Sequence, residues 1–151
     1  MIDRFVVVPA SYLFLLRGDE VLLQLRQNTG FMDGHWAAAA AGHVERGETA
    51  YDAVRREARE ELGLTRVEPE FEFTMQRTRG GEPIDERVDF FFTARDWSGE
   101  PTILEPDKCA DLRWCALDDL PQPVVPHELM ALRSLGTGAK YLAHGFEGGQ
   151  R

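Results

Sequence analysis

Three glutamates, Glu57, Glu60 and Glu61, are the residues of this chain whose type and spacing most clearly suggest chemistry. In an α-helix, residues three and four positions apart place their side chains on one face. Carboxylates this close repel each other and destabilise a helix by roughly a few tenths of a kcal/mol unless a counter-charge compensates. A divalent cation would compensate, and oxygen ligands suit Mg²⁺ or Mn²⁺. The spacing therefore indicates a metal site on one helix face.

Arginines interleaved with these glutamates offer a different explanation. Arg55, Arg56 and Arg59 would neutralise the acids on a solvated helix face that binds no ligand. For an arbitrary helix this solvated face is the better interpretation. Only the wider motif described below reverses the preference.

The helix that carries the acids is predicted from Thr49 to Leu62. Thr49 with Asp52 three residues later approximates a capping box, and Gly63 stands where a helix usually ends. A neighbouring stripe of the same helix is apolar and recurs every four residues: Val54, Ala58 and Leu62. The helix can therefore bury one side in a core while another side presents acids.

The elements that must position this helix are mainly strands. Runs rich in Val, Leu and Phe predict strands at Phe5–Val8, Tyr12–Leu16, Val21–Arg26, Val88–Ala94 and Leu112–Ala116. A second helix is expected around His127–Leu135. Several strands with two helices among them predict an α+β or α/β sandwich in which helices cover the faces of a sheet.

Glycines and polar runs mark the connections. Gln76–Glu86, with two glycines and a proline, is predicted to be a loop that joins strands. From about residue 137 a flexible tail is expected, on the evidence of four glycines: Gly138, Gly145, Gly148 and Gly149. A chain of 151 residues has room for one buried core, so a single domain is predicted over residues 1–151.

The segment 42–64, GHVERGETAYDAVRREAREELGL, resembles the Nudix box at every specified position. Gly42 is followed after five residues by Glu48, and after seven more by Arg56-Glu57, Ala58, Glu60-Glu61 and Gly63-Leu64. The resemblance implies the Nudix α/β/α sandwich with a mixed sheet. It also implies a metal-dependent hydrolase. Directly before the box, Ala40-Ala41 stands where many members have Pro-Gly, so a differently shaped loop is expected before the Gly42 carbonyl.

The resemblance also implies roles for individual residues. Glu57, Glu60 and Glu61 resemble the metal-binding acids, with the Gly42 carbonyl as a further ligand for Mg²⁺ or Mn²⁺. Glu48 and Arg56 resemble the supporting pair that orients the loop onto the helix. The alternative is that Glu48 and Arg56 form an ordinary structural salt bridge, which predicts nearly the same contact.

The residue that deprotonates the attacking water is left open between two candidates. Glu57 is the first choice, and Glu105, in a loop before the Trp114 strand, is the second. Arg26 resembles a position that meets substrate phosphate, although a solvated arginine at a strand end explains it equally well. Trp114 itself is expected in the core, and the four histidines are assigned no role.

Composition limits the partners. The formal net charge of −9 disfavours DNA or RNA as a polymer, because backbone binding requires clustered Lys and Arg. A small phosphorylated, nucleotide-like substrate stays compatible, since a held cation inverts the local charge. Cys109 and Cys115 are expected to be free thiols in a reducing compartment, the cytoplasm. No apolar run is long enough to span a membrane, and a homodimer is left open.

The resemblance thus implies hydrolysis of a pyrophosphate linkage in a nucleoside diphosphate derivative: a nucleoside triphosphate, an oxidised nucleotide or a nucleotide sugar. One rival is a non-catalytic nucleotide-binding regulator on the same fold, since a fold does not fix a function. Another is an isomerase of isoprenoid diphosphates, which would need further catalytic Cys and Glu positions that the sequence does not show.

Overall fold

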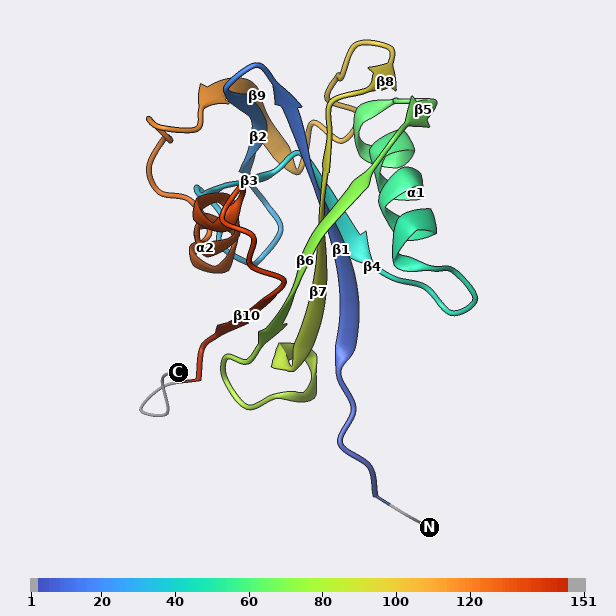
Figure 1. The fold of residues 1–151 in the computed structure, drawn as a ribbon, viewed down its shortest axis with the longest axis vertical. Coiled ribbons are helices and arrows are strands. Elements are labelled where there is room, and N and C mark those ends of the chain that lie inside the picture. The colour runs from blue at the N-terminus through green and yellow to red at the C-terminus, as the bar shows by residue number, and fades with distance from the viewer. Residues whose placement is uncertain (1–2, 147–151) are drawn as a thin grey trace.

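The computed structural model describes residues 3–146, and its chain trace is shown in Figure 1. The helices are α1 (Ala50–Leu62) and α2 (Pro126–Ser134), with a short 3-10 turn η1 (Pro83–Asp85). The strands are β1 (Val8–Arg17), β2 (Glu20–Arg26), β3 (Trp36–Ala38), β4 (Ala40–His43), β5 (Arg66–Val67), β6 (Glu70–Arg77), β7 (Arg87–Ala94), β8 (Trp97–Ser98), β9 (Cys109–Ala116) and β10 (Tyr141–His144).

The strands form a mixed sheet around the long strand β1. β1 runs parallel to β7 and antiparallel to β4, and its last residues turn into an antiparallel hairpin with β2. β2 also pairs with β3 and β9, while β6 lies between β7 and β10. Helix α1 covers one side of this arrangement and α2 the other (Figure 1). The predicted α/β/α sandwich with a mixed sheet is confirmed.

Helix α1 begins and ends as its sequence predicts. Thr49 is the N-cap and forms a reciprocal capping box with Asp52. Gly63 ends the helix in the left-handed conformation, at φ 74°, which an L-residue adopts only at a cost. Ala58 and the rest of the predicted apolar stripe are buried against Leu13 and other residues of β1 and β7. This packing fixes the direction in which the remaining faces of α1 point.

A second core lies on the other face of the sheet. Because strand side chains alternate between faces, β1 sends Leu13 toward α1 and its neighbours Tyr12 and Phe14 toward α2. Ala131 and Leu132 of α2 pack into this second core together with aromatic residues of β6 and β7. Each helix therefore belongs to its own core, with the sheet between them.

Two strand predictions near the N-terminus require correction. A strand was expected at Phe5–Val8, but β1 begins only at Val8, and the side chains of Phe5 and Val6 are exposed. The strand expected at Tyr12–Leu16 is longer on its N-terminal side, because β1 runs without a break from Val8 through Pro9 to Arg17. Proline is tolerated at the beginning of a strand, where a missing N–H costs little.

Two further corrections concern the edge of the sheet. The predicted loop Gln76–Glu86 begins too early, because β6 continues through Arg77 and pairs with β7. The predicted tail from about 137 contains β10, which pairs in parallel with β6 over Tyr141–His144. Backbone pairing with a distant strand orders this glycine-flanked segment, and local composition does not report it. Gly148 and Gly149 lie outside the described residues.

Cys109 and Cys115 lie on β9, where both are buried and neither forms a disulfide. They are free thiols, as predicted. Within residues 3–146, neither helix has the length and the apolar run needed to cross a lipid bilayer.

Candidate active site

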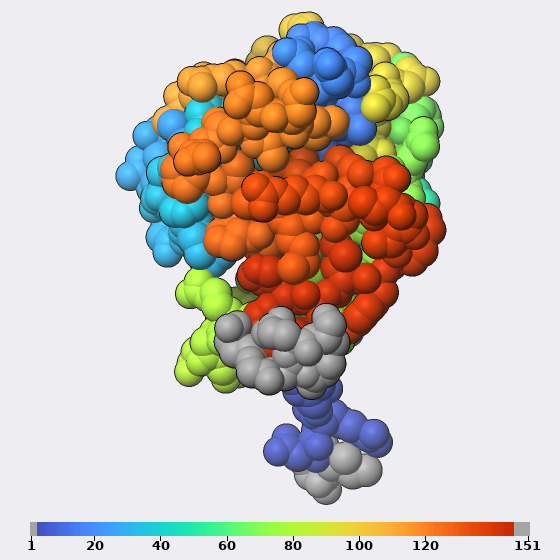
Figure 2. Space-filling view, turned by 60° about the vertical axis from the view of Figure 1, so that its left-hand side comes forward, coloured from blue at the N-terminus to red at the C-terminus, as the bar shows by residue number. Residues whose placement is uncertain are grey.

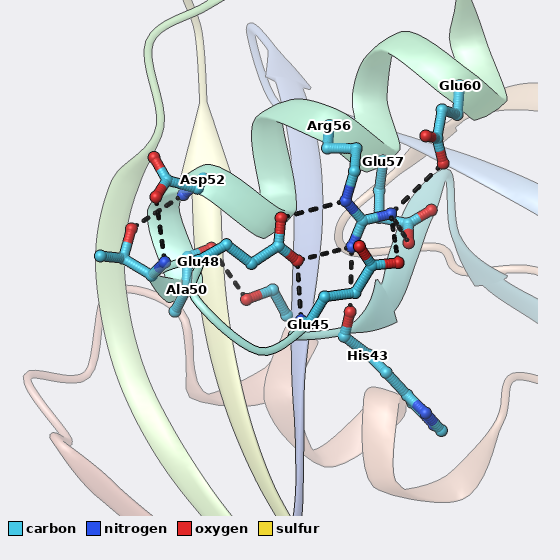
Figure 3. Close-up of polar contacts among 10 residues, drawn as sticks. His43, Glu45, Glu48, Ala50, Asp52, Arg56, Glu57 and Glu60 are labelled. Atoms are coloured by element: carbon cyan, nitrogen blue, oxygen red, sulfur yellow. Dashed lines mark hydrogen bonds and ion pairs between the residues drawn. The ribbon is translucent and has the colours of Figure 1, made fainter.

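Arg56 ties the loop that follows β4 to helix α1. Its guanidinium donates to both carboxylate oxygens of Glu48, at 3.1 Å from Nε and 2.7 Å from Nη2 (Figure 3). Nη2 also donates to the backbone carbonyl of His43, at 3.0 Å. Glu48 in turn accepts the backbone N–H of Glu45, and the bonds from Arg56 are the main reason that the pKa of Glu48 is lowered. The pair predicted to orient the loop onto the helix is in contact.

The three glutamates of the predicted metal site differ in their contacts. Glu57 accepts a hydrogen bond from Arg56 Nη1 at 2.9 Å, and Glu60 accepts a longer one, 3.3 Å, from the same atom. Glu60 lies at the exposed end of this group (Figure 3). In residues 3–146, no three His, Cys, Asp or Glu side chains are arranged as a metal site. Glu57 therefore contacts both partners: it lies beside Glu61, and it shares the donor Arg56 Nη1 with Glu60.

Glu61, like Glu57, is partly buried, whereas Glu60 is exposed. Its Oε2 accepts the backbone N–H of Ala41 at 3.1 Å. Burial, and then the adjacent carboxyl of Glu57, raise the pKa of Glu61 well above its ordinary value. Two neighbouring carboxyls cannot both ionise at neutral pH without a compensating charge.

Gly42 is required next to Glu57 for steric reasons. It lies on β4, opposite Ser11 of β1, and a Cβ atom at this position would overlap the carboxyl group of Glu57. The departure from the family pattern at Ala40-Ala41 is absorbed locally, because both alanines continue β4. The neighbouring carboxyls of Glu57 and Glu61, beside the backbone of Gly42, are oxygen donors that fit a hard divalent cation.

A cavity of about 410 Å³ opens beside Gly42 and Glu61. Figure 2 shows the segment around residues 25–40, in light blue to cyan, and the segment around residue 80, in yellow-green, beside the red C-terminal part of the chain. Residues from all three segments line the cavity. Its walls include four arginines: Arg26, Arg77, Arg79 and Arg87. In a chain of net charge −9, this is a local concentration of positive charge next to the acids.

Arg26 lies in this cavity wall, and it also holds a loop in place. Its Nε donates to the carbonyl of Phe31 at 2.8 Å and its Nη2 to the hydroxyl of Thr29 at 2.9 Å. The structure thus places Arg26 within the same cavity as Glu61, with part of its hydrogen-bonding capacity used by the loop after β2.

Glu105 lies near Glu61 but outside the main cavity. The two acids line a separate small cavity of about 20 Å³, and the charge of Glu105 contributes to the raised pKa of Glu61. The backbone carbonyl of Glu105 accepts the N–H groups of Lys108 and Cys109, which holds the loop before β9. Both candidates for the general base are therefore close to Glu61.

The buried floor of the main cavity was missed by the sequence reasoning. Arg77 donates to Asp89 at 2.7 Å and to the Tyr12 hydroxyl at 3.1 Å, and a ring nitrogen of His127 lies 3.1 Å from the same hydroxyl. Glu128, next to His127 on α2, accepts the backbone N–H of Ala38 at 2.7 Å. Asp89, inside the apolar run of β7, could have indicated this cluster, because a buried charge needs a partner.

Glu128 makes the stability of the protein depend on pH. Burial raises the pKa of this carboxyl from 4.5 to about 7, although the Ala38 N–H and the charges of Arg26 and Arg77 oppose the shift. The folded state therefore keeps a proton that the unfolded chain releases near pH 4.5, so stability falls as the pH rises from 4.5 to about 7. The loss should be on the order of 3 kcal/mol.

Urea unfolding of the wild type and of Glu128→Gln over this pH range checks the expectation. Other buried acids such as Asp89 and Glu61 are present in both proteins, so the difference between the two curves isolates Glu128. The wild type should lose stability relative to the variant as the pH rises. Parallel curves would show that Glu128 does not change protonation in this range.

Comparisons with known proteins agree with this arrangement. A family model described as the NUDIX domain matches residues 7–134. The NAD-capped RNA hydrolase NudC of Stutzerimonas stutzeri is 31% identical over 113 residues, which are 75% of this chain and 38% of that protein. The isopentenyl-diphosphate Delta-isomerase of Cereibacter sphaeroides is 31% identical over 121 residues, which are 78% of this chain and 68% of that one.

A solved structure shows the same architecture. The MutT NUDIX hydrolase from Burkholderia pseudomallei superposes with a TM-score of 0.78 at 29% identity, over 86% of this chain and 98% of the other. The chain spans well under half of the NudC protein, so the activity of that whole protein does not transfer with the match. The box on α1, the sandwich fold and a family match over most of the length lead to one conclusion: the chain belongs to the Nudix family.

Proposed function

We propose that this protein hydrolyses a pyrophosphate linkage in a nucleoside diphosphate derivative, with Mg²⁺ or Mn²⁺ as cofactor. The observation that carries the proposal is the contact between the carboxyls of Glu57 and Glu61 at the edge of an arginine-lined cavity. The acids attract a divalent cation and the arginines attract phosphate, so the site suits a phosphate-containing substrate that binds together with a cation. Nucleoside triphosphates, oxidised nucleotides and nucleotide sugars all belong to this class.

The residues proposed to hold the cation are Glu57, Glu60, Glu61 and the carbonyl of Gly42. A bound cation of this kind neutralises phosphate oxygens and lowers the pKa of a bound water. Arg56 with Glu48 keeps the loop that contains Gly42 against α1.

Substrate phosphate is proposed to meet Arg26, which lines the cavity next to the acids. Glu57 is the proposed base that takes the proton from the attacking water, with Glu105 as the alternative. The cavity volume of about 410 Å³ is in the range of small-molecule sites, and the acidic surface disfavours a nucleic-acid polymer. A small nucleotide is therefore a better substrate for this chain than the capped RNA that the name of the NudC relative includes.

The isomerase named among the relatives is not proposed for this chain. Such an isomerase would need further catalytic positions, a cysteine and a glutamate. Of the residues that the structure describes, no cysteine lines the main cavity, and both cysteines are buried on β9. A non-catalytic regulator is disfavoured because the acids of the box are all present and two of them are in contact.

Metal dependence is the direct test of the proposed function. A screen with Mg²⁺ over nucleoside triphosphates, oxidised nucleotides, nucleotide sugars and dinucleoside polyphosphates should find hydrolysis of at least one class. Excess chelator should abolish that turnover, and added Mg²⁺ or Mn²⁺ should restore it. Circular dichroism in chelator should show an intact fold. Full activity in excess chelator would contradict the proposal.

A further inference from the structure

Glu128 is a buried acid in the main cavity that the proposed hydrolysis does not use. Its side chain is 3% exposed, and it lies near the beginning of α2. Oε1 accepts the backbone N–H of Ala38 at 2.7 Å, while Oε2 has no hydrogen bond within residues 3–146. Every fully enclosed side-chain oxygen or nitrogen in that range has a partner. Oε2 must therefore face the cavity that Glu128 lines.

The arginines around the cavity do not pair with Glu128. Arg77 donates to Asp89 and Tyr12, and Arg26 donates to the loop after β2. A buried carboxyl oxygen without a donor is costly, so such a group calls for a ligand that brings an N–H to it. The structure supplies an acceptor at the floor of the cavity and leaves the donor to the bound molecule.

Phe31 supplies a flat apolar surface in the same cavity. The loop that carries it is held by Asp33, which accepts the backbone N–H groups of Thr29 and Gly30. The loop also keeps Asn28 and Met32 at positive φ, 55° and 52°, conformations that persist only where the surroundings enforce them. The ring position is therefore set before any ligand binds.

Two arginine side chains lie over this ring. The guanidinium carbon of Arg79 lies 5.0 Å from the centroid of the Phe31 ring, and that of Arg26 lies 5.5 Å away. A planar heterocycle can stack on such a ring by displacing the exposed side chain of Arg79 from its face. An acceptor at the floor and a stacking surface on the wall are the two contacts that a nucleobase uses.

We propose, on the basis of the proposed function, that the cavity selects nucleotides whose base carries an exocyclic amino group, with Glu128 as the acceptor and Phe31 as the stacking partner. The amino groups of cytosine, guanine and adenine are N–H donors, whereas an oxo group in the same place would meet the carboxylate lone pairs. Glu128 is thus a specificity-determining residue on α2, separate from the acids of α1.

Binding of mononucleotides tests this selection without any turnover, because they contain no pyrophosphate. Calorimetry at about pH 8.5, where the carboxyl is ionised, compares CMP with UMP, GMP with IMP, and AMP with IMP. The wild type should bind the amino-bearing member of at least one pair roughly tenfold or more tightly. Equal affinities within all three pairs would overturn the proposal.

Glu128→Gln is the sharpest variant, because the backbone of Ala38 dictates how the new amide lies. Its carbonyl oxygen keeps the hydrogen bond from the Ala38 N–H, so its NH₂ group faces the cavity. The acceptor becomes a donor, so the preference should reverse toward UMP in the CMP pair or toward IMP in the AMP pair. In the GMP pair it should be lost, because IMP carries a hydrogen in place of the amino group. A variant that keeps the wild-type preference would refute the role of Glu128.

Two further variants complete the test. Phe31→Leu should weaken the binding of both members of a pair by a similar factor and leave their ratio unchanged, whether or not Glu128→Gln folds. A changed ratio in Phe31→Leu would contradict the separate roles. Glu68→Gln removes an exposed carboxylate that lies outside the cavity and should change neither affinity nor ratio.

The outcomes separate this inference from the proposed function. Selective binding without Mg²⁺-dependent hydrolysis of any substrate would keep the role of Glu128 and reject the hydrolase. Hydrolysis by a protein whose three mononucleotide pairs bind equally would keep the hydrolase and reject the role of Glu128.

Discussion

Glu57→Gln should lower kcat by at least about 100-fold on whichever substrate the hydrolysis screen finds. Glutamine keeps the size of the side chain and removes the charge that lies beside Glu61 and against Gly42. The variant would lose both a proposed cation ligand and the proposed base. The measurement is kcat at saturating Mg²⁺, with thermal unfolding to verify that the variant is folded.

Glu105→Gln is the matched control for this prediction. Glu105 also lies near Glu61 but outside the main cavity, so its substitution should cost less than that of Glu57. A larger loss for Glu105→Gln would place the base in the loop before β9. If neither substitution changed turnover, the catalytic assignment would fail and a nucleotide-binding module would be the better explanation.

Ala58→Asp should destabilise the protein by roughly 3–5 kcal/mol, because it places an unpaired charge in a closed core. Ala58 is 0% exposed and packs between Val54 and Leu62, where α1 meets the sheet. Neither water nor a basic side chain of this core can compensate the new carboxylate. Urea unfolding monitored by circular dichroism gives the free energy of unfolding.

Arg59→Ala is the neighbouring control on the exposed side of the same helix. It should change the free energy of unfolding by no more than about 0.5 kcal/mol, since surface substitutions away from special features cost little. Similar losses for Ala58→Asp and Arg59→Ala would mean that the buried face of α1 is misassigned.

Features set by local chemistry were predictable from the sequence. The capping box at Thr49 and the left-handed Gly63 depend on neighbouring residues only, and both are present. The contact between Arg56 and Glu48 is also encoded within one short motif. In contrast, the convergence of all three box acids on one cation stays a prediction, and helix spacing did not foresee that Glu57 and Glu60 share the hydrogen-bond donor Arg56 Nη1.

Features that depend on distant partners were not predictable in the same way. β10 exists because β6 offers it a parallel edge, although glycines surround it in the sequence. β3 and β4 consist largely of alanine, a poor strand former, and burial between the two cores overrides that preference. Glu128 reaches the cavity only because α2 brings it to Ala38, ninety positions earlier in the chain.

The placement of the two helices in separate cores has a consequence for evolution. Mutations that repack α2 and the loops near it can change which ligand is favoured while the core under α1, and with it the acids, stays intact. Distant, independent sites respond to mutation almost additively. A lineage built on this plan can therefore acquire new substrates stepwise, which fits the differing activities named for relatives of about 30% identity.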